Sequence, residues 1–322
     1  MFNLRKSQTN GSLSAFRMLS KLNIKLLVTI ICLSFIGISI YGNFESLLNQ
    51  RINIQEIIWL LFAIIFSFLS IIFNAYAWQL LINNIGYNSN KLNFIKLFLA
   101  TNIYKYLPGG IWHFVYRYKK LRLEFSKEKS IESILLEPLL MIVAGILFIP
   151  LGSLNIYFST LCWSSTLVFL PGFRKLLIKI LKEIKSTIFS TNDQLKEVNP
   201  LQNKKDISIN MIYPYKPLLV EIIFVLFRFF GFLCCVNAFS IGSLISQSEL
   251  ISSFSLAWVI GLIVPAAPGG LGVFESVILL KLGTNLPEAP LLAALLFYRL
   301  VSTISDILAA LIYPVKNYLR FK

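Results

Sequence analysis

Two Pro-Gly-Gly sequences interrupt apolar stretches of the chain, and they limit the possible folds more than any other feature. The first lies in KYLPGGIWHFVYR at residues 105–117, and the second lies in VPAAPGGLGVFES at residues 264–276. Proline lacks a backbone N–H and glycine readily leaves helical dihedral angles, so a helix is expected to end at each sequence. An apolar run follows each break. We therefore expect two pairs of short helices, each joined by a Pro-Gly-Gly turn.

The composition indicates that these helices lie in a membrane. Of the 322 residues, 56% are hydrophobic and 14% are charged, and the mean hydropathy is +0.72. Several apolar runs are long enough to cross a bilayer. The formal net charge of +15 comes largely from Lys and Arg gathered between apolar runs, which is typical of cytoplasmic loops that contact anionic lipid. This arrangement argues against a partner that is a nucleic acid.

The distribution of basic residues predicts the path through the membrane. The first span, 24–41, follows a strongly basic flank, which places the N-terminus in the cytoplasm. The chain returns through 54–82, and the last span, 289–315, ends at a basic tail on the same side. We expect an integral multi-pass protein of the plasma (inner) membrane, with both termini cytoplasmic.

The predicted fold class is all-α, a polytopic transmembrane bundle of roughly six full spans plus two hairpins, or of about eight short spans. Charge and apolarity divide the chain into successive parts. They are a basic cytoplasmic N-terminus (1–23), a first membrane half (24–170) with a hairpin at 92–125, a cytoplasmic amphipathic and polar linker (171–216), a second membrane half (217–315) with a hairpin at 250–282, and a cytoplasmic tail (316–322).

The two hairpins are predicted to enter the membrane from opposite sides. The opening helix of the first is too short for an ordinary span and both of its flanks are basic, so this hairpin dips in from the cytoplasm. The second starts and finishes outside if the last span runs inward. Two such re-entrant hairpins form an inverted repeat, as in many transporters. The alternative is a plain bundle in which every short segment crosses.

Charged residues inside the predicted spans need partners or a wet cavity, because a lone charge in the membrane costs several kcal/mol. They are Glu137, Glu221, Arg228, Arg299 and Asp306. A spacing of seven residues separates Glu221 from Arg228, and Arg299 from Asp306, which is too far for a bridge within one helix. Each charged residue must therefore pair with a residue on another helix. We expect Glu221 to pair with Arg299, or Arg228 with Asp306. Such pairs either serve function or only lock the helices together.

The helices that begin after Gly110 and Gly270 would present unpaired backbone N–H groups, which can hold a phosphate. The alternative is that these glycines only permit tight turns and close packing. Glu275 could balance an arginine or recognise a cationic head group, and Arg117 is expected at the cytoplasmic mouth of the first hairpin, as a phosphate contact or as one more topology-setting charge. The predicted substrate-binding residues are Pro108, Gly109, Gly110, Arg117, Arg228, Pro268, Gly269, Gly270, Glu275 and Arg299, with Glu137, Glu221 and Asp306 as intramembrane charge partners.

No catalytic or metal site is expected. The single histidine is His113, and Cys32, Cys162, Cys234 and Cys235 all lie in apolar stretches without histidines or carboxylates at metal-ligand spacing. We expect no cofactor. The sequence favours a lipid transporter over an enzyme, although a membrane glycosyl- or aminoacyl-transferase and an accessory subunit that works with a glycosyltransferase remain as alternatives.

The chain resembles the lysylphosphatidylglycerol synthase transmembrane-region family, whose members are also described as flippase-like membrane proteins. The resemblance rests on APGGLGVFES, on LPGGIWHFVYR and on LLFYRLVS near the C-terminus. The first of these, with Glu275, is the most specific, whereas Trp112 and His113 stand where a commoner form has Gly and Glu. The resemblance implies a membrane domain that moves or binds a phospholipid or a lipid-linked sugar. In the synthases a separate soluble domain transfers the aminoacyl group, and we expect that domain to be absent here.

Overall fold

The computed structural model describes residues 54–86, 92–107, 110–153, 155–173, 213–264 and 272–312, together with Tyr41 and Glu45. Every regular element in these residues is a helix. Nearly all of the predicted first span and most of the predicted linker lie outside them. The same holds for Pro108, Gly109, Pro268, Gly269 and Gly270.

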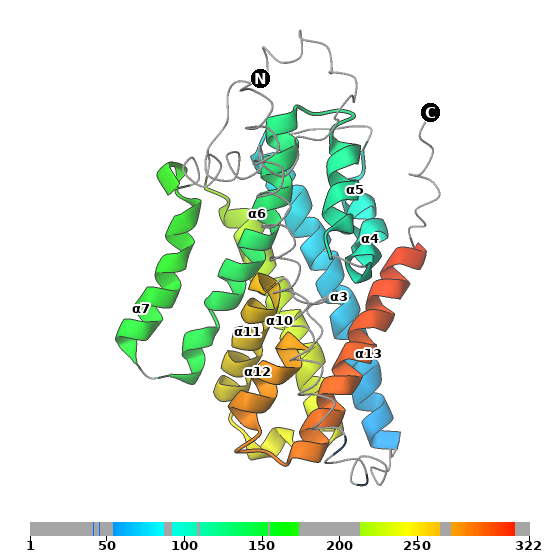
Figure 1. Cartoon of the computed structure of the whole chain (residues 1–322), viewed down its shortest axis with the longest axis vertical. Coiled ribbons are helices and arrows are strands. Elements are labelled where there is room, and N and C mark those ends of the chain that lie inside the picture. The colour runs from blue at the N-terminus through cyan, green and yellow to red at the C-terminus, as the bar shows by residue number, and fades with distance from the viewer. Residues whose placement is uncertain are drawn as a thin grey trace, which may run out of the picture.

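Long apolar helices form the frame of the described chain. They are α3 (Ile54–Asn84), α6 (Lys127–Ile146), α10 (Tyr215–Ala238) and α13 (Glu288–Ile312), and the short 3-10 helix η2 (Ile149–Gly152) extends α6. All 4 are long and apolar enough to cross a membrane. The prediction of an all-α polytopic membrane protein is confirmed. A shorter apolar helix, α7 (Ile156–Ser164), continues into η3 (Ser165–Phe169) and stands at the edge of the bundle (Figure 1).

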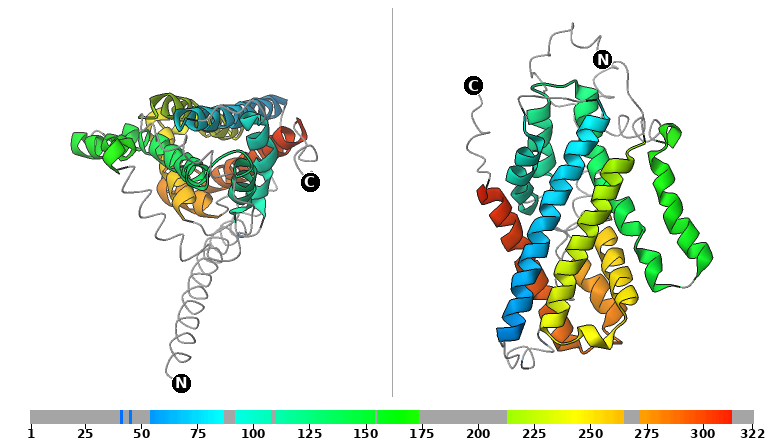
Figure 2. Two further views of the ribbon diagram at one scale, coloured as in Figure 1. Left: turned by 90° about the horizontal axis from the view of Figure 1, so that it is seen from above. Right: turned by 180° about the vertical axis from the view of Figure 1, so that it is seen from behind.

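Helices α3 and α10 lie side by side and antiparallel, as the right-hand view of Figure 2 shows. The buried face of α3 carries small residues at intervals of three or four positions, namely Ala63, Ser67 and Ser70. Gly231 of α10 faces this stripe, because a Cβ built there would lie 2.6 Å from Ser67 Oγ. Small residues on both helices let the two backbones approach closely, which is a usual basis for helix association in membranes.

Two pairs of short helices occupy opposite halves of the bundle (Figure 1). The first pair is α4 (Phe94–Asn102), which runs into the 3-10 helix η1 (Ile103–Tyr106), and α5 (Trp112–Leu121). The open end of this helix pair lies at the end of the bundle where α3 ends and α6 begins. We call this end of the bundle the basic end, after Lys119, Lys120, Arg122 and Lys127. The second pair is α11 (Gln247–Ile263) and α12 (Val273–Leu282), which opens at the opposite end. The helix ends that flank the two breaks lie near the middle of the bundle.

Local sequence explains where these short helices begin. Asn93 caps α4 by accepting from the Lys96 N–H at 3.0 Å, and Ser246 caps α11 through the Glu249 N–H at 3.3 Å. The breaks require positive φ angles, which are 65° at Gly110 and 89° at Gly272. Glycine adopts such angles without a steric cost, so the chain can turn sharply at both places.

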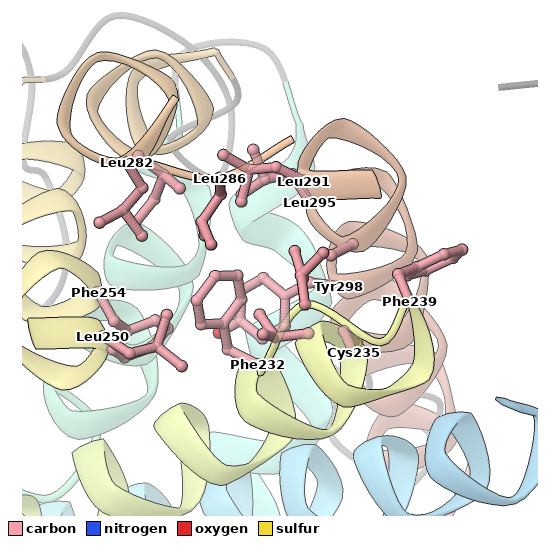
Figure 3. Packing of buried hydrophobic residues seen from close by; sticks show 14 of the residues in the cluster. Phe232, Cys235, Phe239, Leu250, Phe254, Leu282, Leu286, Leu291, Leu295 and Tyr298 are labelled. Carbon is pink, nitrogen blue, oxygen red and sulfur yellow. The ribbon is translucent and has the colours of Figure 1, made fainter. Parts of the chain in front are cut away.

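The apolar interior falls into two clusters along α10. The first cluster lies in the half opposite the basic end and includes Phe232 of α10, Phe254 of α11 and Tyr298 of α13, which pack together in Figure 3. The second lies nearer the basic end and joins α3, α4, α6 and α10. On α10 the second cluster reaches Val225 and the first begins at Phe229. Arg228 therefore lies where one apolar cluster gives way to the other.

Candidate functional site

Asp306 of α13 is the carboxylate through which the last long helix contacts the first helix pair. Its side chain is 0% exposed. Asn102 Nδ2 donates to Oδ1 at 2.7 Å, and Tyr106 Oη donates to Oδ2 at 2.6 Å. Lys105 Nζ lies 2.8 Å from Oδ2. The residues just before the first break thus surround one buried carboxylate with donors, which offsets the cost of its burial.

Arg228, near the middle of α10, is a second cation beside Asp306. Its Nη2 lies 4.0 Å from Asp306 Oδ1, so the predicted pairing is confirmed at the outer limit of an ion pair. Nη1 donates to Ser302 Oγ at 3.3 Å, whereas Nε has no hydrogen-bond partner among the described residues. The guanidinium carbon lies 5.7 Å from the centre of the Trp258 ring. Arg228 therefore joins α10 to α13 and to α11 while part of its donor capacity stays unused.

Glu275 of α12 binds Arg299 of α13. Arg299 Nε donates to Glu275 Oε1, and Nη2 donates to Oε2 at 3.3 Å. Oε2 also accepts from the Gly272 N–H at 2.8 Å, so Glu275 closes the first turn of α12 while it holds the arginine. The prediction that Glu275 balances an arginine is confirmed. One consequence is that a carboxylate already occupies the start of α12, where the sequence suggested backbone N–H groups for a phosphate.

These contacts form one polar group, which we call the central cluster: Lys105, Tyr106, Arg228, Glu275, Arg299 and Asp306. Thr303 connects its two parts, since Oγ1 donates to the Arg299 carbonyl at 2.9 Å and lies 3.5 Å from Tyr106 Oη. The cluster holds three cationic side chains and two carboxylates, which leaves one positive charge in excess. Lys105 and Arg299 are 22% and 21% exposed, whereas both carboxylates and Arg228 are buried. The accessible part of the cluster is therefore cationic.

Arg117 is placed differently from the prediction. It is 0% exposed, so its expected position at an open mouth is wrong. Nη1 donates to both oxygens of Glu137 at 2.6 and 2.8 Å, and Nε donates to Thr101 Oγ1 at 2.9 Å. The guanidinium carbon lies 3.7 Å from the centre of the Phe98 ring. The physical reason is that α5 turns this residue toward α4 and α6, while the neighbouring Lys119 stays exposed.

The predicted pair of Glu221 with Arg299 is not formed. Arg299 is committed to Glu275, and Glu221 Oε2 has no hydrogen-bond partner among the described residues. Glu221 lies on the second turn of α10, nearer the basic end than Arg228. The need of these charged residues for partners on other helices was predicted from their spacing, but the partner of Arg299 was not.

Several residues of the central cluster were not among the predicted site residues. Lys105 and Tyr106 are such residues, and Thr303 and Asn102, which contact the cluster, were not predicted either. Lys105 carried a usable signal, since a lysine inside an apolar run just before a break is costly unless it has a partner. Of the predicted glycines, Gly110 is described, with its N–H donating to the Leu107 carbonyl at 3.0 Å.

Comparison with known families agrees with this architecture. The sequence matches the profile of the Lysylphosphatidylglycerol synthase TM region over residues 22–310, which is nearly the whole chain. A search of curated proteins finds no significant match. The matched region includes both Pro-Gly-Gly sequences, the long helices of the frame except the last residues of α13, and every residue of the central cluster. The chain therefore belongs to the lysylphosphatidylglycerol synthase transmembrane-region family.

Proposed function

We propose that this protein moves a lipid between the leaflets of its membrane and binds the phosphate of the lipid head group at the central cluster. The observation that carries the proposal is the accessible, cation-rich group at the middle of an apolar bundle, beside the ends of two broken helices. Ionisable residues at membrane depth are costly and usually mark a substrate or ion path.

The charge of the cluster suits a phosphodiester. Such a group carries one negative charge, and the cluster has one positive charge in excess. Lys105 and Arg299 supply the exposed donors, and a guanidinium can bind two phosphate oxygens at once. Glu275 keeps Arg299 oriented through its paired contacts. A bound phosphate would therefore neutralise the cluster and use donors that the protein holds in place.

The surroundings of the cluster suit a lipid rather than a free anion. Leu300 and Leu296 flank Arg299 on α13 and are exposed, and Leu107 and Ile111 beside the first break are exposed as well. Acyl chains could thus stay against apolar side chains while the head group contacts the cations. A free phosphate would gain nothing from these apolar neighbours.

We infer that the two helix pairs are re-entrant hairpins that give the cluster access from the two sides in turn. Their opposite orientation in the bundle (Figure 1) supports this inference, because inverted hairpins with a shared central site are a common basis of alternating access. In this scheme the basic end faces the cytoplasm of an inner membrane, and both termini lie on that side.

Transfer between leaflets in reconstituted vesicles tests the proposal. A fluorescent phospholipid is placed in one leaflet, and a membrane-impermeant quencher reports its arrival in the other. Lys105→Met should reduce protein-dependent transfer at least about tenfold, because hydrogen bonds to charged groups are worth about 1.5–3 kcal/mol. Lys119→Met is the control, since Lys119 is exposed at the basic end. Transfer by Lys105→Met at the rate of the control would contradict the assignment of Lys105 to the head-group site. Competition by inorganic phosphate would indicate that the site binds a soluble anion instead.

Cysteine accessibility tests the hairpins separately. The natural cysteines are first replaced, and single cysteines are placed at Leu107 and at Ile263, which are exposed residues just before the two breaks. We expect an impermeant thiol reagent to label Leu107→Cys from the cytoplasmic side and Ile263→Cys from the outer side. Labelling of both positions from one side would contradict the inverted arrangement.

A further inference from the structure

A buried carboxyl without a counter-charge lies on α10, two helical turns before Arg228. The Glu221 side chain is 1% exposed, and its Oε2 forms no hydrogen bond with any described residue. The ion pairs found in the described part of the chain do not include it. A buried carboxylate is normally paired or hydrogen-bonded, because the loss of hydration is otherwise uncompensated. The proposed lipid site makes no use of this group.

The surroundings of Glu221 are apolar. Leu218, Phe224 and Val225, which lie three or four residues away on α10, belong to the second buried cluster. Leu136 and Leu140 of α6 belong to the same cluster, and α6 packs against α10. Water is therefore kept away from the carboxyl on the face that it shares with α6.

Glu137 of α6 is a second buried carboxyl, on a helix that packs against α10. Arg117 compensates its charge by donating to both of its oxygens. Among the described residues no ion pair gives Glu221 such a cation. An ionised Glu221 would therefore add one uncompensated negative charge to an apolar interior.

Other charged groups on the helices packed against α10 do not supply the missing charge. Asp306 and Arg299 of α13 are held in the central cluster. Glu56 of α3 and Glu249 of α11 lie near the ends of their helices that are remote from the basic end. Lys127 and Glu128 of α6 and Glu288 of α13 are exposed. The remaining ones are Lys216 in the first turn of α10, Arg228 beside Asp306, Glu137 bound to Arg117, and Lys129 and Glu132 of α6, of which the last two have interactions of their own.

We propose that Glu221 binds a proton at this position and that the proton is released during lipid transfer. On release, the proton passes to water at the basic end, where α10 begins, and Glu221 becomes a carboxylate.

Glu221 lies on the same helix as Arg228 of the central cluster, two turns away. The coupling of proton release to lipid transfer rests on the proposed function, whereas proton binding by Glu221 does not.

Infrared difference spectroscopy of the purified protein in lipid nanodiscs tests the proton site. At neutral pH the wild type should show the carbonyl band of a protonated carboxylic acid that is missing in Glu221→Gln. Glu128→Gln, which changes an exposed carboxylate in the first turn of α6, should leave the band in place. Glu221→Asp should keep an acid band at a shifted position, which guards against loss of the band through misfolding. Loss of an ionised carboxylate band in Glu221→Gln would overturn the proposal.

Vesicle transfer under an imposed pH gradient tests the coupling. We expect the gradient to change the transfer rate of the wild type several-fold and to leave the rate of Glu221→Gln unchanged. An equal response of the two proteins would overturn the coupling. A wild type that shows the acid band but transfers no lipid under any gradient would contradict the proposed function and leave the proton site standing.

Discussion

Removal of one partner of the buried Arg117–Glu137 pair should destabilise the protein more than removal of both. The pair is fully buried and has two N–H···O contacts of 2.6 and 2.8 Å. Breaking such a pair on one side typically costs about 3–5 kcal/mol, because the remaining charge stays buried without a partner. In Glu137→Gln the arginine keeps Thr101 and the Phe98 ring. Because these contacts remain, we expect the loss in the free energy of unfolding to lie near the lower end of this range, at about 3 kcal/mol. This corresponds to roughly a hundredfold change in the unfolding equilibrium constant.

The double variant Arg117→Met/Glu137→Leu should lose about 1 kcal/mol or less of the free energy of unfolding, since apolar residues of similar volume often replace a buried ion pair at little cost. Arg117→Met alone should be at least as harmful as Glu137→Gln, because it leaves the buried Glu137 without its counter-charge. The measurement is reversible unfolding of the purified protein in mild detergent or bicelles, arranged as a double-mutant cycle. Single variants that are each as stable as the double variant would refute the reasoning.

Other variants test the packing, the second break and the central cluster. Gly231→Leu should lower stability by about 1–3 kcal/mol through overpacking against Ser67, seen as a lower midpoint of thermal unfolding, whereas Gly172→Leu, in open space, should leave the midpoint unchanged. Gly272→Ala should cost about 1–2 kcal/mol because φ is 89° there, and should speed amide hydrogen exchange in the first turn of α12. Arg228→Met should weaken retention of an anionic phospholipid about tenfold or more in native mass spectrometry, and unchanged retention would exclude Arg228 from the site.

The sequence was sufficient to predict the helices and their breaks. Apolar runs predicted the long helices of the frame, and the two Pro-Gly-Gly sequences predicted where the short helices end. These features depend on local chemistry, since hydrophobic length and helix-breaking residues act within a few turns. The membrane family could be suspected from the same sequences, and the profile match confirms it.

The partners of the charged residues could be predicted only in part, because they depend on how each helix is rotated about its axis. Arg299 of α13 pairs with Glu275 of α12 and not with Glu221, and sequence spacing does not encode that choice. Arg117 was expected at the cytoplasmic mouth of the first hairpin because it stands near other basic residues. Its helical spacing from His113 and Leu121, which are also buried, is the signal that indicates a buried face.

The proposed function requires that a lipid phosphate contacts the cations of the central cluster. Solid-state NMR on protein with labelled arginine nitrogens, reconstituted with a phospholipid, measures this contact as dipolar coupling between lipid phosphorus and guanidinium nitrogen. We expect a coupling that is lost in Arg299→Lys and kept in Arg122→Lys, because Arg122 lies at the basic end and donates to the Phe125 carbonyl. A coupling that is the same in both variants would contradict the proposed contact.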